Sequence, residues 1–198
     1  MYQFVETICI REGEPRLVDY HQARLNRTFV RYFPGYEPFD LSLRLSEIDA
    51  KTGIIKCRFL YNQENFELDL QPYKAPVIKS LKVICASNIN YSYKTIDRSQ
   101  LAALYALRGV YDDIIIINDR GQVTDSYFAN LVFFDGKEWL TPDSCLLPGV
   151  KRQYLIDQGI LKVRPITHQD LPHFEKVSLI NAMMDIGEVE VNRENLVI

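Results

Sequence analysis

Hydrophobic positions in the first part of the chain follow strand spacing on both sides of one helical stretch. Residues 2–10 have the composition of a strand, and the turn EGEP that follows predicts residues 16–20 as the hairpin partner. Apolar residues then recur at helical spacing through residues 21–33, and Pro34 ends this helix. The pattern predicts two paired strands followed by an amphipathic helix.

A second helix and two further strands complete this part of the chain. Residues 41–50 can form a helix with Asp40 as its N-cap. Residues 54–62 and 65–73 have strand composition around a short polar turn. Two prolines interrupt the stretch QPYKAPVIKS that follows, which marks a domain boundary. We therefore expect a small α+β domain that spans residues 1–76.

Strand-like and helical segments alternate from there to the C-terminus. Strand-like runs cover residues 81–87, 111–119, 160–166 and most of 123–142, and helical patterns cover residues 99–109 and 150–159, with a polar helix near 167–175. This alternation predicts an α/β domain at residues 77–198, in which a barrel-like sheet carries peripheral helices.

Composition narrows the classes of function. With 198 residues, of which 47% are hydrophobic, the chain can bury a substantial core. Its net charge of -3 provides no basic field for nucleic acid, and no apolar run approaches the roughly 20 residues of a membrane span. The N-terminus lacks the pattern of a secretory signal. We expect a cytoplasmic protein with neither a nucleic-acid nor a membrane partner.

The cysteines lie far apart, mostly within apolar strand-like runs. They are Cys9, Cys57, Cys85 and Cys145. This distribution is typical of reduced thiols in a core, so we expect neither a disulfide framework nor a metal site.

The stretch SNINYSYKTIDRSQL, residues 87–101, places one lysine, Lys94, among small polar and aromatic residues ahead of a helix. If Tyr91, Tyr93 and a strand end exclude water from Lys94, its pKa falls and a neutral amine forms, which can condense with an aldehyde. The competing interpretation is a solvated surface lysine, because most lysines are exposed. The local residues alone allow both interpretations.

Five motifs occur in an order that favours the reactive amine over the surface lysine. They are HQARL at 21–25, KTIDR at 94–98, GQVTDSYFANLVFF at 121–134, LLPGVKRQ at 146–153 and SLINAMMDIGEV at 178–189. In this order the chain resembles the class IV pyridoxal-phosphate-dependent aminotransferase family, which includes branched-chain and D-amino-acid aminotransferases and aminodeoxychorismate lyase. The resemblance implies the two-domain fold type IV, with a small α+β N-terminal domain and a C-terminal pseudo-barrel that binds the cofactor.

The resemblance also implies roles for the residues that carry the chemistry. Lys94 would bind the aldehyde of pyridoxal 5'-phosphate and later act as the base for the substrate's α-proton. Asp125 stands where the family usually has glutamate and would pair with the protonated ring nitrogen, through a closer approach or a bridging water. Asn130 would support that carboxylate or the backbone, without a catalytic role, and His21 would pack or orient its helix. A turn aspartate is the competing interpretation of Asp125.

A second set of residues would hold the cofactor's phosphate. Arg24 matches the family's phosphate-binding arginine, with an exposed helix arginine as the competing interpretation. Val150 and Lys151 would present backbone N–H groups at a helix N-terminus. Many relatives carry threonine at the positions of Lys151 and Ala182, so Asn181, the Ala182 N–H and Arg24 would carry more of the binding. We expect weaker cofactor retention as a result.

The spacing of Lys94, Asp97 and Arg98 resembles the K-x-x-N-R pattern of aminodeoxychorismate lyase. The resemblance implies conversion of 4-amino-4-deoxychorismate to pyruvate and 4-aminobenzoate, a folate precursor. Arg98, with Arg58 behind it, would bind a substrate carboxylate, and a structural ion pair is the competing interpretation for both arginines.

Two alternatives stay open. One is a class IV aminotransferase that uses the same Lys94, Asp125 and Arg24 on a D-amino acid or on a branched-chain or small α-keto acid. The other is a degenerate, non-catalytic protein that binds the cofactor, which the two missing hydroxyls and the short segment before the ETICI strand favour. For the enzyme we expect a small amino-acid-like substrate. The resemblance implies a homodimer, and the aromatic segments YQFV and FVRYF are candidates for its interface, with plain core packing as the competing interpretation.

Overall fold

The computed structural model of the chain describes residues 1–48 and 52–197. The chain forms two compact units, which are described separately. Unit 1 contains Met1–Lys74 and Tyr93–Asp97, and unit 2 contains Ala75–Ser92 and Arg98–Ile198.

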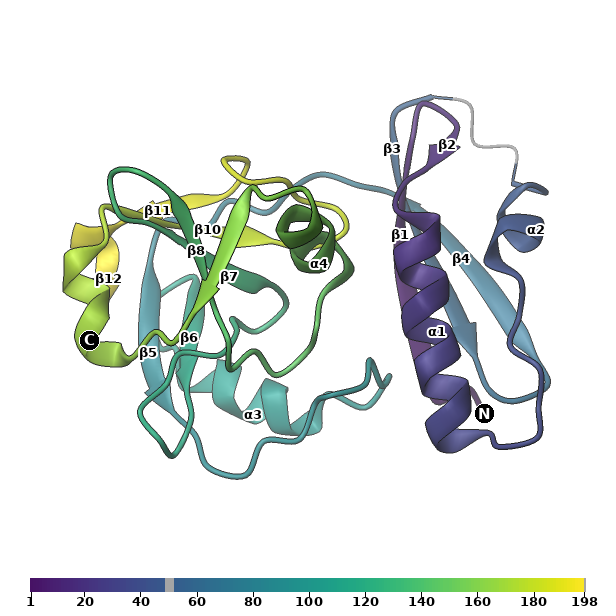
Figure 1. The fold of residues 1–198 in the computed structure, drawn as a ribbon, viewed down its shortest axis with the longest axis horizontal. Helices are drawn as coiled ribbons and strands as arrows, with labels where there is room; N and C mark the ends of the chain where they lie inside the picture. The colour runs from purple at the N-terminus through teal and green to yellow at the C-terminus, as the bar shows by residue number, and fades with distance from the viewer. Residues whose placement is uncertain (49–51, 198) are drawn as a thin grey trace. The chain divides into compact units, whose positions relative to one another are not determined.

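Unit 1 is an antiparallel sheet covered by a helix (Figure 1). Its strands are β1 (Phe4–Arg11), β2 (Glu14–Pro15), β3 (Ile54–Tyr61) and β4 (Phe66–Pro72), in the spatial order β2-β1-β3-β4. Helix α1 (Val18–Tyr32) runs along the sheet, and the short helix α2 (Leu41–Leu45) follows it. Strands β1 and β3 pair along their whole length, from Phe4 with Tyr61 to Arg11 with Ile54.

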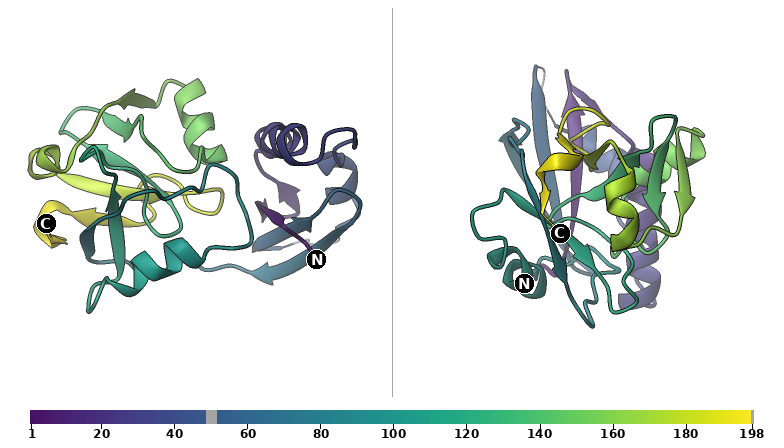
Figure 2. Two further views of the ribbon diagram at one scale, coloured as in Figure 1. Left: turned by 90° about the horizontal axis from the view of Figure 1, so that it is seen from below. Right: turned by 90° about the vertical axis from the view of Figure 1, so that its left-hand side faces the viewer.

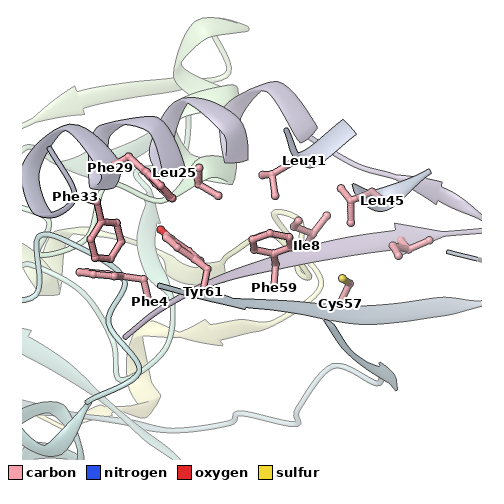
Figure 3. Close-up of a cluster of buried hydrophobic side chains, with 11 residues drawn as sticks. Phe4, Ile8, Leu25, Phe29, Phe33, Leu41, Leu45, Cys57, Phe59 and Tyr61 are labelled. Atoms are coloured by element: carbon pink, nitrogen blue, oxygen red, sulfur yellow. The ribbon is translucent and has the colours of Figure 1, made fainter. Parts of the chain in front are cut away.

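The core of unit 1 lies between α1 and the sheet. Figure 3 shows Leu25 and Phe29 of α1 directed toward Ile8, Phe59 and Tyr61 of the strands. The rings of Phe29 and Tyr61 stack, with centroids 5.9 Å apart. Burial of this aromatic and aliphatic surface fixes the helix on the sheet, because apolar contact is the main stabilising contribution in such a layer.

Two predictions for unit 1 need correction. The hairpin partner of β1 is only Glu14–Pro15, since α1 already begins at Val18, after a left-handed residue at Leu17 with φ 56°. The second helix ends at Leu45, although Asp40 caps it as predicted by accepting from the Leu43 N–H at 3.0 Å. The predicted end of that helix, residues 49 and 50, lies outside the described residues. The strands at β3 and β4 are confirmed.

Unit 2 contains two sheets. The larger has the order β11-β10-β7-β8-β9, and the smaller has the order β12-β5-β6. The strands are β5 (Leu81–Cys85), β6 (Asp113–Ile117), β7 (Asn130–Phe134), β8 (Trp139–Pro142), β9 (Leu161–Arg164), β10 (Lys176–Ile180), β11 (Glu190–Asn192) and β12 (Leu196–Val197), and the helices are α3 (Ser99–Ala106), α4 (Val150–Asp157), η1 (His168–His173) and η2 (Arg193–Asn195). The C-terminal β12 lies beside β5 (Figure 2). The predicted mixture of strands and helices is confirmed.

The segment before β7 differs from the prediction of a nearly continuous strand. Residues 123–129 form isolated bridges and a tight turn, in which the Ser126 hydroxyl oxygen accepts from the N–H groups of Phe128 and Ala129. Ser is favoured in such turns because its oxygen can accept from nearby N–H groups. The turn reverses the chain and places Asp125 opposite Asn130.

The segment Tyr93–Asp97 packs with unit 1, although the predicted domain 77–198 contains it. Its backbone extends the sheet at β1: the Val5 N–H donates to the Lys94 carbonyl at 3.0 Å, and the Ile96 N–H donates to the Gln3 carbonyl at 2.9 Å. Lys94 is therefore held by the same strand that carries the core of unit 1.

The cysteines divide into two groups. Cys9 and Cys57 are buried as predicted, whereas Cys85 is exposed at the end of β5 and Cys145 is half-buried. The expectation that the thiols lie in the core is thus wrong for Cys85, which is the last residue of its strand. Among the residues that the structure describes, no helix has the length and apolarity that crossing a membrane requires.

Candidate active site

A buried cluster of charged and polar side chains interrupts the apolar core of unit 1. Glu6 lies on β1 between Phe4 and Ile8, which face α1, and none of its surface is exposed. Arg24 on α1 donates from Nε to Glu6 Oε1 at 2.9 Å and from Nη2 to Glu6 Oε2 at 2.5 Å. One turn earlier on the same helix, His21 Nδ1 lies 2.6 Å from Glu6 Oε2. One carboxylate thus holds two side chains of the HQARL motif.

The charges in this cluster determine the protonation of each member. Burial alone would raise the pKa of Glu6, but the Arg24 charge and the hydrogen bonds from His21 and Arg24 outweigh it and lower the pKa to about 2. The ionised carboxylate can only accept, so His21 Nδ1 carries the hydrogen. Burial lowers the pKa of His21, against the hydrogen bond to Glu6 and the Glu6 charge, which raise it, and the charges of Arg24 and Lys94 lower it further. His21 is therefore neutral, and its buried Nε2 has no hydrogen-bond partner.

This cluster brings together two of the predicted site residues. Lys94 and Arg24 are 70 positions apart in the sequence, and the charges of both act on His21. Lys94 itself is half-buried, and the ring of its neighbour Tyr93 packs edge-on against Tyr32 with centroids 5.0 Å apart. The ring of Tyr93 thus packs against α1, whereas Tyr91 belongs to unit 2, and the shielding of Lys94 by these rings stays a prediction.

The two arginines predicted in unit 1 have different surroundings. Arg24 is 6% exposed, so the interpretation as an exposed helix arginine is wrong. Arg58 lies on β3, with its side chain 37% exposed and Nη1 3.4 Å from Asp69 Oδ2. Arg58 therefore takes part in the structural ion pair that was its competing interpretation.

Asp125 occupies a buried position in unit 2, where hydrogen bonds fix its carboxylate. Asn130 donates from Nδ2 to Asp125 Oδ1 at 2.8 Å, and the Leu147 N–H donates to Asp125 Oδ2 at 2.9 Å. The Asn130 amide also donates to the Leu147 carbonyl at 2.9 Å, so one side chain orients both partners. Asn130 thus supports the carboxylate as predicted.

The protonation of Asp125 is poised near neutrality. Burial raises the pKa of the carboxyl to about 6, against the hydrogen bonds from Leu147 and Asn130, which lower it. A carboxyl with this pKa can carry a proton below pH 6 and release it above. This behaviour is typical of groups that exchange a proton with a bound ligand.

The predicted phosphate-binding segments of unit 2 meet at the start of α4. Gly149 precedes the helix, and no side chain caps its first turn. Lys151 Nζ pairs with Asp185 Oδ1, which links the start of α4 to the turn after β10. In that turn Asn181 Oδ1 accepts from the Met183 N–H at 2.8 Å. The side chain of Asn181 is therefore engaged in its own turn, and the backbone N–H groups at the α4 start are the better-placed anion donors.

Arg98 is engaged within unit 2. Its guanidinium lies 4.3 Å from the centroid of the Tyr127 ring, and Nη2 donates to the Tyr127 carbonyl. Its buried Nε has no hydrogen-bond partner, and neither has Oδ2 of the buried Asp113, the pKa of which burial raises to about 6. These contacts hold Arg98 against Tyr127 within unit 2. Its predicted contact with a substrate carboxylate stays a prediction.

Sequence reasoning missed Glu6. Its signal was present, because Glu6 is the one charged residue in the alternating row Phe4, Glu6, Ile8 and Ile10, which otherwise packs under α1. A carboxylate in such a row predicts a buried partner. The backbone donor at Leu147 had no sequence signal, since it depends on how the segment before α4 passes the Ser126 turn.

Comparison with known proteins identifies the family. The sequence profile described as amino-transferase class IV matches residues 58–191. The chain belongs to this family. Its members are enzymes that depend on pyridoxal phosphate, and the chain is by membership an enzyme of this class.

Three individual proteins show how far the similarity extends. An uncharacterized protein of Haemophilus influenzae is 35% identical over 92% of this chain and 98% of its own length. The crystal structure of a putative 4-amino-4-deoxychorismate lyase from Haemophilus somnus is 34% identical, with a TM-score of 0.88, and covers 92% of this chain and 97% of its own. A putative amino-acid aminotransferase from Mesorhizobium loti shares the fold over 100% of both chains, at 21% identity and a TM-score of 0.82.

The residues of each unit fit the family's cofactor. Pyridoxal phosphate requires an amine for its aldehyde, cationic or N–H donors for its phosphate and an acid for its ring nitrogen. Unit 1 provides Lys94 and Arg24, and the unsatisfied Nε2 of His21 marks a polar position beside them, since buried polar atoms normally have partners. Unit 2 provides the buried Asp125 and the uncapped start of α4. The two units therefore contain the amine, the phosphate donors and the acid that the cofactor requires.

Proposed function

We propose that the chain is a pyridoxal-phosphate-dependent lyase that converts 4-amino-4-deoxychorismate to 4-aminobenzoate and pyruvate. The observation that carries this proposal is the similarity to the Haemophilus somnus protein, which extends over nearly the whole of both chains. The spacing of Lys94, Asp97 and Arg98 supports the same choice within the family.

In this proposal the cofactor supplies an aldehyde that takes up the substrate's amino group and a ring that accepts electrons. Lys94 Nζ would hold the aldehyde of the cofactor before the substrate arrives. Once displaced, Lys94 Nζ takes the proton from the substrate carbon that bears the amino group. The bond between the substrate ring and the enolpyruvyl oxygen would then break, and the released enolpyruvate would take up a proton to become pyruvate. The remaining ring would be aromatic, which makes the reaction strongly favourable.

Asp125 controls the charge of the ring nitrogen. Its carboxyl, with a pKa of about 6, can bring the proton that the nitrogen needs and remain as the matching anion. Asn130 and the Leu147 N–H keep both carboxylate oxygens oriented, and each oxygen can accept a further hydrogen bond. The shorter reach of aspartate is thus balanced by a fixed orientation.

The phosphate is held by charge and by backbone donors. Arg24 provides a cation that stays protonated at every working pH. The first N–H groups of α4, at Val150 and Lys151, provide unpaired donors at the positive end of the helix dipole. We further propose that the enzyme works as a homodimer in the cytoplasm, which light scattering of the purified protein and cell fractionation would test.

The decisive experiment supplies purified protein and pyridoxal phosphate with 4-amino-4-deoxychorismate and measures 4-aminobenzoate and pyruvate. Release of both without an added keto acid is the expected result. Product that appears only when a keto acid is added would show an aminotransferase instead. Cofactor binding without turnover of 4-amino-4-deoxychorismate or amino acids would show a non-catalytic protein.

A further inference from the structure

Among the described residues of unit 1, Glu6 is the most deeply buried charged group. It is 0% exposed, and its neighbours on the same face of β1, Phe4 and Ile8, are 2% and 0% exposed. Burial of a carboxylate is costly, and a buried ion pair can often be replaced by apolar side chains without loss of stability. A stabilising role alone therefore gives no reason for a carboxylate at this position, which points to a role in the site.

The geometry shows what Glu6 does to Arg24. Its two oxygens accept from Nε and Nη2, which lie on one edge of the planar guanidinium. Two parallel hydrogen bonds fix the plane of the guanidinium as well as its position, because the donors of arginine form a rigid fork. His21, which donates to Oε2 at 2.6 Å, fixes the carboxylate in turn.

We propose that Glu6 is a positioning residue: it holds the Nε and Nη2 edge of Arg24 and so directs the remaining edge of the guanidinium toward the cofactor's phosphate. This inference rests on the proposed function, because it requires a phosphate at Arg24.

Two effects of Glu6 on phosphate binding oppose each other. Its negative charge offsets the charge of Arg24, whereas its hydrogen bonds spare Arg24 the ordering that binding would otherwise require. Arg24 is only 6% exposed, and without Glu6 its buried cation would have to turn toward water. The positioning effect therefore dominates.

The test separates phosphate binding from all other binding. Full-length apoprotein is titrated with pyridoxal phosphate and with pyridoxal, which lacks the phosphate, while the visible absorbance of the lysine-bound cofactor is followed. The dissociation constant of pyridoxal divided by that of pyridoxal phosphate is a ratio that measures the contribution of the phosphate. Glu6→Gln should lower this ratio at least about tenfold and leave the dissociation constant of pyridoxal within about twofold. An unchanged or increased ratio would overturn the proposal.

Matched variants exclude a general loss of stability. Ile8→Ala removes a buried side chain from the same face of the same strand, so it should lower Tm but leave the ratio within about twofold. Glu6→Asp keeps the charge but shortens the reach, and it should also lower the ratio, which keeps the proposal testable if Glu6→Gln folds poorly. A ratio that Ile8→Ala lowers as much as either Glu6 variant would overturn the proposal.

A double variant tests whether Glu6 acts through Arg24. Arg24→Lys keeps the charge but loses the planar fork of donors. The double variant Arg24→Lys with Glu6→Gln should therefore have a ratio less than about threefold below that of Arg24→Lys alone. A double variant that shows the full product of the two single effects would overturn the proposal. Wild-type protein that binds pyridoxal as tightly as pyridoxal phosphate would instead refute phosphate binding itself, and with it the proposed function, before any variant is examined.

Discussion

Gly149 lies against Asn130 so closely that a β-carbon at residue 149 would stand 1.9 Å from Asn130 Oδ1. The backbone of Gly149, with φ -72° and ψ 143°, is accessible to any residue, so conformation does not require glycine here. The contact does. It connects the start of α4, a proposed phosphate site, to the amide that orients Asp125.

Gly149→Ala should therefore displace Asn130 and break its hydrogen bonds to Asp125 and the Leu147 carbonyl. We expect the free energy of unfolding to fall by about 1–3 kcal/mol, measured by urea denaturation. In an Asn130→Ala background the clash is absent, so the same substitution should cost less than about 0.5 kcal/mol. Additive losses in the double variant would contradict this account.

Asp125 should make stability depend on pH. Its pKa is raised from 3.8 to about 6 in the folded protein, so the folded state retains the proton that the unfolded state loses. This contribution is complete below pH 3.8 and is lost as the pH rises through 6, which amounts to about 3 kcal/mol.

The pKa of Asp113 is also raised to about 6, so Asp113 adds its own pH dependence to the stability in the same range. Because Asp113 is present in both proteins, comparing wild type with Asp125→Asn isolates the contribution of Asp125. Urea denaturation of the apoprotein at pH 4, 5, 6 and 7 should show wild type losing more stability than the variant as the pH rises. Parallel pH profiles would show that Asp125 does not titrate near 6.

Glu6 should have the opposite dependence. Its pKa is lowered from 4.5 to about 2, so its stabilising contribution is present above pH 4.5 and is lost as the pH falls toward 2. Glu6→Gln should cost about 3 kcal/mol at pH 7, since the neutral amide leaves the buried charge of Arg24 unpaired and keeps only one of the two acceptor oxygens, and the difference should shrink below pH 4. A difference that is constant between pH 7 and pH 3 would argue against an ionised Glu6.

Restoring the family's hydroxyl should strengthen cofactor retention. Ala182→Thr adds a donor in the turn after β10, near the start of α4, and a hydrogen bond to a phosphate should lower the dissociation constant of pyridoxal phosphate about tenfold. Ala182→Val has the same shape without the hydroxyl and serves as the control. Dialysis followed by absorbance measures the loss of cofactor. Equal retention by the two variants would indicate that the hydroxyl does not reach the phosphate.

The sequence predicted the elements that depend on local pattern. The helix around Leu25 and Phe29 and the strands at β3 and β4 follow from spacing alone, and Asp40 was recognisable as a cap. It could not predict that Tyr93–Asp97 joins unit 1, because that depends on backbone hydrogen bonds with Gln3 and Val5, which are distant in the sequence.

The site was predictable only in part for the same reason. Lys94, Arg24 and Asp125 could be named from motifs, and so could the support of Asp125 by Asn130, which lies in the same motif. The pairing of Arg24 with Glu6 requires β1 to lie under α1 in one register, which no local pattern specifies. Side-chain identity predicts chemistry, whereas partners depend on tertiary contact.

The most direct test of the account is to identify the lysine that carries the cofactor. Protein loaded with pyridoxal phosphate is reduced with borohydride, digested and mapped by mass spectrometry. The account predicts the cofactor's mass on the peptide that contains Lys94, and no label there in Lys94→Ala. Label on another lysine, or none in wild type, would contradict it.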